Sequence, residues 1–192
     1  MIAGYGLVFF LLLFFYDYIP RRYVYQKAYQ YIYTLFEYLF FAFILYLNIQ
    51  TKLLKRIVGL CILGFIAFQV TFYITQMDAK LDAVPVGIET ILIFIFIFFF
   101  FYEQFLNVKD QFIYAHYCFW ICIGMLIYLG GNLFFNLLAN HLDTDNFWYT
   151  TYIIETVKNL LFAVGLLIYI KSPETTLSNK NSKIPYLDID LT

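Results

Sequence analysis

The stretch NFWYTTYIIETVKNLLFAVGLLIYI, residues 146–170, decides the fold class of this chain. It is long enough to cross a bilayer as a helix, because about 20 apolar residues at ~1.5 Å per residue span the hydrocarbon core. Polar side chains interrupt it near its centre. Glu155 precedes Lys158 by three residues and Asn159 by four, so we expect all three on one helical face. Ionisable groups inside a membrane span are costly and mark candidate functional sites.

The composition of the 192-residue chain indicates an integral membrane protein. Hydrophobic residues make up 63% of the chain and charged residues only 13%, whereas soluble domains carry about 25% charged residues. This deviation predicts an all-α, polytopic transmembrane helix bundle that forms one domain over residues 1–171. Residues 172–192 are polar and are expected to form a disordered cytoplasmic tail. The net charge of −1 gives no reason to expect nucleic acid as a partner.

Hydropathy divides the chain into about six candidate spans, at residues 2–18, 28–49, 57–75, 83–102, 111–139 and 146–170. We expect loops at residues 50–56 and 103–110, and the fifth span could kink at Gly130 and Gly131. With six spans, seven Lys and Arg residues fall on one side of the membrane and four on the other. The positive-inside rule then places both termini in the cytoplasm, and we expect a bacterial cytoplasmic membrane.

In this topology nearly every polar side chain within the spans falls in the outer half of the membrane. The set comprises Glu37, Glu89, Glu155, Lys158, Asn159, Asn132, Asn136, Gln69, Tyr73 and Tyr128. We interpret these residues as a ligand-binding pocket that is open to the outer face, with Glu155 as the counter-ion of Lys158. The alternative is a set of structural ties between helices. Three glutamates against one lysine favour the first interpretation, because the surplus carboxyls must hold protons or a cation.

The sequence predicts no catalytic residues, no metal site and no cofactor. Cys61, Cys118 and Cys122 all lie in apolar stretches, where we interpret them as packing residues. His116 and His141 do not have metal-ligand spacing, and no Gly-rich loop could hold a phosphate group. Whether the chain is an enzyme stays open at this stage, and the absence of a nucleophile–base pair favours a protein that is not one.

Three segments, VPVGIETILIFIFIFFFFYEQF, FWICIGMLIYLGGNLFF and FWYTTYIIETVKNLLFA, resemble a family of small, multi-span, uncharacterised bacterial integral membrane proteins. The resemblance implies a sensor-like role beside signalling proteins and no catalytic residues. Lys158 is also similar to the lysine that holds retinal in the last helix of microbial rhodopsins. That family has seven spans and a carboxylate four residues before its lysine, whereas here Glu155 lies three residues before Lys158.

The leading functional hypothesis is a sensor or accessory subunit. Its outward-facing polar pocket would bind a proton, a cation or a small polar ligand, and a membrane or cytoplasmic signalling partner would receive the signal. One alternative is a small transporter or channel subunit, which needs a polar path through the inner half that the sequence hardly offers. Another is an intramembrane enzyme that acts on lipid, with glutamate and lysine as acid and base. Besides the lipid bilayer, a homo-oligomer is an open possibility.

Overall fold

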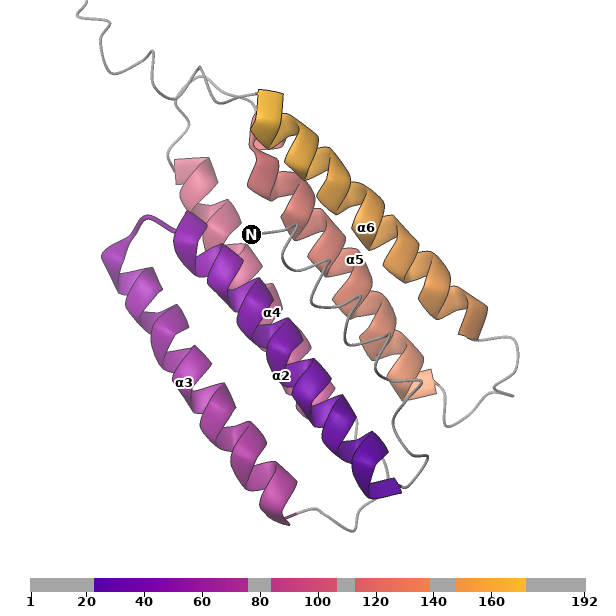
Figure 1. Cartoon of the computed structure of the whole chain (residues 1–192). Helices are drawn as coiled ribbons and strands as arrows, with labels where there is room; N and C mark the ends of the chain where they lie inside the picture. Colours follow the sequence, from indigo (N-terminus) through magenta and orange to yellow (C-terminus); the bar gives the residue numbers. More distant parts are fainter. Residues whose placement is uncertain (1–22, 76–83, 107–112, 139–147, 172–192) are drawn as a thin grey trace, which may run out of the picture.

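The computed structural model describes residues 23–75, 84–106, 113–138 and 148–171. These residues form five long helices and one short 3-10 helix, without strands among them (Figure 1): α2 Tyr23–Asn48, α3 Lys52–Thr75, α4 Val84–Leu106, η1 Ile113–Ala115, α5 Tyr117–Leu138 and α6 Trp148–Lys171. Five helices are long and apolar enough to cross a membrane. The predicted all-α, multi-pass architecture is therefore confirmed for these residues. The predicted first span, 2–18, and the predicted tail, 172–192, lie outside them.

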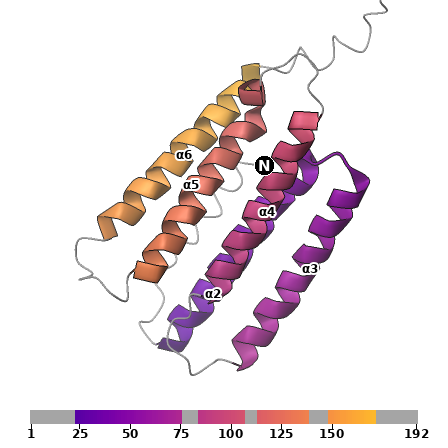
Figure 2. The ribbon, with the colours of Figure 1, turned by 180° about the vertical axis from the view of Figure 1, so that it is seen from behind.

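The long helices alternate in direction through the bundle. α2, α4 and α6 run one way and α3 and α5 run the other (Figure 1), and the view from behind shows the same arrangement (Figure 2). α2 packs against both α3 and α4, α4 also packs against α5, and α5 and α6 form the most extensive pair. Glu37, Glu89 and Glu155 lie on the three parallel helices, Glu89 and Glu155 in the first halves of α4 and α6 and Glu37 just past the midpoint of α2. This common direction agrees with the predicted topology.

The bundle has a mainly apolar core that also contains several polar groups, and it exposes many large apolar side chains on its surface. Its core contains aromatic and aliphatic side chains such as Tyr38, Phe41, Phe96 and Met125. Charged and polar side chains are buried with them: Thr34, Glu37, Gln69, Glu89, Thr90, Glu103 and Lys158. Large apolar side chains, including Leu60 on α3, are exposed on the surface. This distribution suits a chain whose surroundings are hydrocarbon and whose costly polar groups must be shielded.

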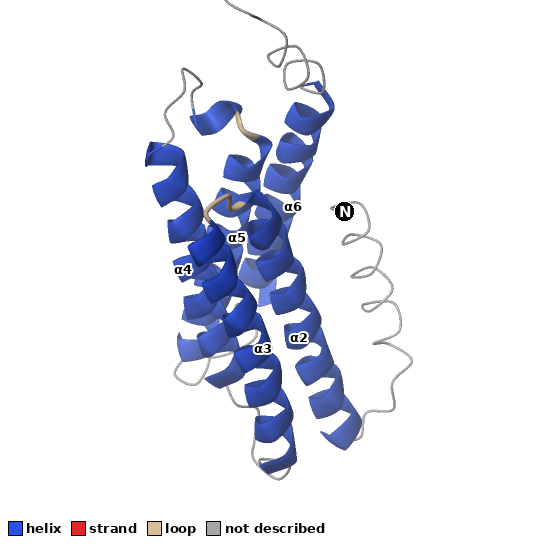
Figure 3. Cartoon of the chain, turned by 90° about the vertical axis from the view of Figure 1, so that its left-hand side faces the viewer, coloured by secondary structure: helices blue, strands red, loops and turns tan. Residues whose placement is uncertain are grey.

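Two of the expected loops are wrong because the helices continue into them. α3 begins at Lys52, so most of the predicted loop 50–56 is helical and the connection from α2 is only residues 49–51, one of the short loops in Figure 3. α4 runs on to Leu106, which places Glu103 in its last turns rather than in a loop. Hydropathy ends a span at the first charged residue, whereas a helix can extend past it when long basic side chains reach outward or a carboxylate finds a partner.

Glycines allow α5 and α6 to approach closely. A Cβ atom on Gly131 would lie 2.5 Å from Cδ1 of Ile154, and one on Gly165 would lie 3.0 Å from the backbone oxygen of Tyr117. α5 is one continuous helix through Gly130 and Gly131. Gly131 therefore serves helix packing in the way that small residues commonly do between membrane helices. Because α6 lies so close to α5, its inward side chains, including Lys158, extend into the interior of the bundle.

We predict that Gly165→Leu destabilises the bundle whereas Gly64→Leu does not. At Gly165 the new side chain would collide with the backbone of α5, which can yield only if the helices separate, whereas at Gly64 nothing lies within 4 Å. Overpacking of this kind costs about 1–3 kcal/mol, and leucine is a better helix former than glycine at both sites. Thermal unfolding in detergent measures the difference. Equal unfolding temperatures for the two variants would contradict the importance of the α5–α6 contact.

Candidate functional site

Lys158 is the centre of the candidate site. Its side chain points from α6 into the bundle, where only 1% of its surface is exposed. The Nζ atom lies 3.7 Å from the centroid of the Tyr128 ring on α5. A cation this close to a ring face is attracted by the negative π cloud, and the attraction is stronger where water is excluded. The aromatic face thus replaces part of the hydration that the ammonium group has lost.

Tyr128 connects the lysine to α2. Its hydroxyl lies 3.2 Å from the hydroxyl of Tyr33, within hydrogen-bonding distance. The ring of Phe41, also on α2, contacts Tyr128 edge-on at 6.3 Å between centroids, and it contacts Phe162 of α6 at 6.2 Å. Three helices therefore meet around the ammonium group. Tyr33 and Phe41 were not among the predicted site residues, although Tyr33 lies four residues before Glu37, on the same helical face.

Two carboxylates act on Lys158. It interacts electrostatically with Glu37 of α2 and with Glu155, the residue one turn before it on α6. Glu37 is 4% exposed, whereas Glu155 is half-buried. Sequence spacing identified Glu155 as the counter-ion, and the structure adds Glu37 as a second carboxyl group that acts on Lys158. Spacing along one helix reveals neighbours on that helix only, so a partner on another helix stays hidden until the packing is known.

Glu89 of α4 is a third buried carboxyl group, and it interacts with Glu37 rather than with Lys158. It is 1% exposed, it interacts electrostatically with Glu37 and Tyr38, and its Oε1 atom has no hydrogen-bond partner among the described residues. Next to it, the Thr90 hydroxyl donates to the backbone oxygen of Val86 in the preceding turn. The buried charges thus form a row across the bundle, from Glu89 through Glu37 to Lys158. This row connects α4, α2 and α6.

The remaining predicted residues divide into those near this row and those away from it. Gln69 of α3 is buried, and its amide donates a 3.4 Å hydrogen bond to the backbone oxygen of Tyr31. Tyr73 is half-buried, with its ring edge-on to that of Tyr31 at 5.2 Å. Asn132 is half-buried on α5, one turn beyond Tyr128. The side chain of Asn136 lies outside the described residues, although its backbone belongs to α5.

The prediction that Asn159 shares the inward face with Lys158 is wrong. The Asn159 side chain is exposed, whereas Lys158 is buried. Adjacent residues on a helix point about 100° apart. The inward face of α6 follows the spacing of Lys158, Phe162 and Gly165, all of which are buried, and Asn159 lies off this line. A spacing of four from Glu155 was a weak guide, because Glu155 itself lies at the edge of that face.

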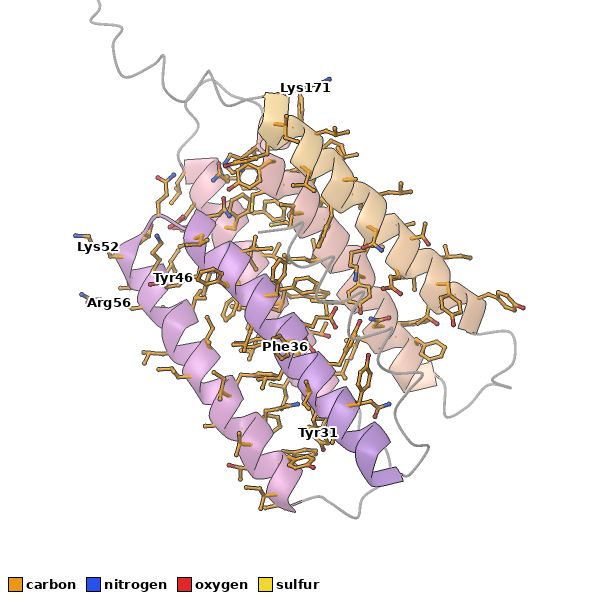
Figure 4. The ribbon with its side chains drawn as sticks, viewed as in Figure 1. Tyr31, Phe36, Tyr46, Lys52, Arg56 and Lys171 are labelled. Atoms are coloured by element: carbon orange, nitrogen blue, oxygen red, sulfur yellow. The ribbon has the colours of Figure 1, made fainter. Side chains whose placement is uncertain are left out.

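At the end of the bundle where α2 and α4 finish, buried polar side chains have hydrogen-bond partners. Glu103 of α4, 3% exposed, accepts 2.7 Å hydrogen bonds from the backbone N–H groups of Gln50 and Thr51. The Tyr117 hydroxyl donates to Oδ1 of Asn48 at 2.6 Å. Figure 4 labels Lys52, Arg56 and Lys171 at this same end, far from Tyr31. We interpret these contacts as structural, because each satisfies the end of a helix or a loop.

The site offers charge and proton chemistry. Within the described ranges there is no group of three His, Cys, Asp or Glu side chains that could hold a metal ion. Cys118 and Cys122 are buried on one face of α5 with their sulfur atoms 3.9 Å apart, in contact with each other. What remains is a buried lysine that interacts with two carboxyl groups, Glu37 and Glu155, and a third carboxyl group, Glu89, that interacts with Glu37.

No protein-family model, curated protein or solved structure matches this chain. The two resemblances drawn from the sequence therefore stay expectations.

We predict that Lys158 is coupled more strongly to Glu37 than to Glu155. Removing one partner of a buried ion pair typically costs about 3–5 kcal/mol, because the other charge is left without compensation. Two double-mutant cycles on detergent stability separate the partners, one with Lys158→Met and Glu37→Gln and the other with Lys158→Met and Glu155→Gln. The loss in the Glu37 cycle should be far from additive. Additive losses in that cycle would contradict the pair.

We predict that acid weakens the start of α5 through His116. Nδ1 of His116 accepts a 3.2 Å hydrogen bond from the N–H group of Cys118, so the ring must be neutral there, and burial lowers the pKa of His116. The unfolded chain therefore binds this proton at a higher pH than the folded chain. Stability should be unaffected above pH of about 6.5 and should fall as the pH drops below it.

His116→Asn provides the matched control. Asparagine is a good N-cap that accepts the same kind of hydrogen bond without titrating. Unfolding temperatures at about pH 7.5 and about pH 5 should differ less in this variant than in the parent protein. An undiminished pH dependence would assign the effect to other groups.

Proposed function

We propose that this protein is a membrane sensor or accessory subunit, in which the Glu37–Lys158 cluster binds a proton, a cation or a small polar ligand. The observation that supports the proposal most is one buried lysine that interacts with two carboxyl groups, Glu37 and Glu155, while a third, buried Glu89, interacts with Glu37. The charges do not balance unless a proton or another cation joins them. The occupancy of the site therefore alters the net charge inside the bundle.

A change of charge at this position is large enough to rearrange helices. Leaving one buried charge uncompensated costs about 3–5 kcal/mol, and converting a two-state equilibrium from 1:99 to 99:1 takes about 5.5 kcal/mol. One binding event therefore supplies most of the free energy of a conformational switch. Since Glu37, Glu89 and Lys158 lie on α2, α4 and α6, these three helices would move relative to one another.

The response would reach the far end of the bundle through rigid helices. α2 carries Glu37 and ends near Asn48, which is bonded to Tyr117 at the start of α5. α4 carries Glu89 and ends near Glu103, which holds the connection from α2 to α3. A shift of α2 against α4 thus pulls on both contacts. The movement would be passed to a signalling partner, or to a second copy of the chain, at that end.

We propose that this end faces the cytoplasm of a bacterial cell. Lys52, Lys55 and Arg56 on α3 and Lys171 on α6 gather there (Figure 4). An excess of Lys and Arg marks the cytoplasmic side of membrane proteins. Both termini would then be cytoplasmic, and residues 172–192 would lie on the side of the partner. The polar cluster would lie in the outer half of the membrane.

A distance measurement at the cytoplasmic end tests the sensor proposal. Spin labels at exposed Leu53 of α3 and exposed Ile170 of α6, on a background without native cysteines, report how α3 moves relative to α6. The distance between labels should change with pH or with added cations in the otherwise native protein. The change should vanish with Glu37→Gln and Lys158→Met together and persist in the control Asn159→Ala. An unchanged distance under all conditions would contradict the sensor.

Ion flux across liposomes distinguishes the transporter alternative. Beyond the cluster the bundle is closed by apolar side chains such as Leu45, Ile49 and Phe100, all with no exposed surface. The sensor should therefore give no flux above empty liposomes. Flux that is abolished by Glu155→Gln would favour a transporter or channel subunit instead.

A further inference from the structure

We propose that Glu89 is the proton-binding residue of the buried cluster, a carboxylic acid that carries one proton while Glu37 stays ionised beside Lys158. The proposal deepens the proposed function, on which its biological meaning rests, by naming both the ligand and the residue that takes it. It follows from the surroundings of Glu89 in the interior of α2, α3 and α4.

The first argument is the distribution of charge. Lys158 interacts with Glu37 and Glu155, which already outnumber it. The electrostatic neighbour of Glu89 is Glu37, which is also a carboxyl group, and no cation acts on Glu89 among the described residues. An ionised Glu89 would therefore place a second negative charge beside Glu37 without compensation. Burial and a like charge both favour the neutral form of a carboxyl group.

The second argument is the contrast between the two buried glutamates of α4. Both oxygens of Glu103 accept hydrogen bonds from backbone N–H groups, which is how a buried carboxylate is stabilised. Oε1 of Glu89 has no hydrogen-bond partner among the described residues, although Glu89 is buried as deeply as Glu103. A neutral carboxylic acid tolerates such surroundings far better than a carboxylate does.

Further groups without partners surround Glu89. The Tyr38 hydroxyl, on a side chain with no exposed surface, interacts electrostatically with Glu89 and has no hydrogen-bond partner among the described residues. Oε1 of buried Gln69 also has none among them. Tyr38 packs against Phe65 of α3 at 4.0 Å between ring centroids, and Phe96 of α4 lies at 6.5 Å. Among the described side chains of these helices, no positively charged group acts on the carboxyl group.

Two titratable groups act on Glu89 among the described residues, Glu37 and Tyr38 of α2. Cys61 of α3 acts on Tyr38, Glu37 interacts with Tyr33 and with Lys158 of α6, and Lys158 interacts with Tyr128 of α5 and with Glu155. Lys158 alone in this set can be positive, and it acts on Glu37 rather than on Glu89. The proton is therefore the charge that balances Glu89.

A proton suits the position better than a metal ion. Ca²⁺ and Mg²⁺ require about six or more oxygen ligands, and the described part of the chain has no group of three metal-ligating side chains. The step itself is simple: one carboxylate oxygen of Glu89 forms an O–H bond with a proton that hydronium delivers, and water is left.

Release of this proton would leave two neighbouring carboxylates with only one ammonium group to compensate their charge. Glu37 and Glu89 would then both be negative in neighbouring positions on α2 and α4, while the ammonium group of α6 can compensate only part of that charge. Repulsion between the two carboxylates would drive α2 and α4 apart. The proton on Glu89 thus keeps the helices together, and its loss is the event that the sensor would register.

Infrared difference spectroscopy in lipid nanodiscs tests the assignment. The protein should show the carbonyl band of a buried carboxylic acid at neutral pH, and the band should shift in D₂O. Glu89→Gln should remove this band, and Glu37→Gln should leave it. Glu103→Gln is the matched control on the same helix and should also leave it, because Glu103 is held as a carboxylate. Exchange of Na⁺ for choline should have no effect.

Three results would overturn the proposal: absence of the band from the native protein, its persistence in Glu89→Gln, or its replacement by a carboxylate signal when Na⁺ is present. Glutamine has the shape of protonated glutamate, so Glu89→Gln should unfold at no lower temperature than the native protein. If the variant does not fold, Glu89→Asp provides a second test, since it should retain a carboxylic acid band at a shifted position. The spectra report protonation whether or not the spin-label distance changes, so failure here is distinguishable from failure of the sensor.

Discussion

The burial of the Lys158 ammonium group is the constraint on which the rest of the bundle depends. A lone lysine at the centre of a membrane helix costs about 2.5–3.5 kcal/mol even on insertion scales. Here the π face of Tyr128 lies 3.7 Å from Nζ, and the carboxyl groups of Glu37 and Glu155 act on it electrostatically. Because these groups belong to α5, α2 and α6, stabilising one charge fixes three helices relative to one another.

The glycines of α5 and α6 contribute to the burial of Lys158. Gly131 and Gly165 allow the two helices to approach until side chain and backbone touch. At a larger separation the ammonium group would lie farther from the Tyr128 ring and from Glu37, and its compensation would weaken steeply in a low-dielectric interior. Van der Waals packing of small residues and the electrostatics of one buried charge therefore require the same helix spacing. Neither alone explains why α6 binds so closely to α5.

Much of this architecture could be predicted from the sequence. Hydropathy measures the cost of placing polar groups in hydrocarbon, and the same cost determines which side chains the bundle buries. Five predicted spans correspond to α2–α6, and Glu37, Glu89 and Lys158 were identified as buried polar groups. The sequence could not identify Glu37 as a partner of Lys158, since that contact depends on how α2 and α6 pack. The sequence also placed Asn159 on the inward face of α6, because spacing along one helix does not show which side of that helix faces its neighbours. Glu103 was assigned to a loop because a charge normally ends an apolar run.

Glu103 and Glu89, two buried glutamates of the same helix, have opposite surroundings. A carboxylate that holds a structure together is surrounded by donors, as Glu103 is by two backbone N–H groups at 2.7 Å. Glu89 is equally buried, yet it lies beside another carboxyl group, and its Oε1 has no donor among the described residues. If stability alone had shaped this position, an apolar residue of similar volume would serve better. A carboxyl group that destabilises its surroundings whenever it ionises is useful where ionisation changes the structure, and the proposed proton sensing would require such a change.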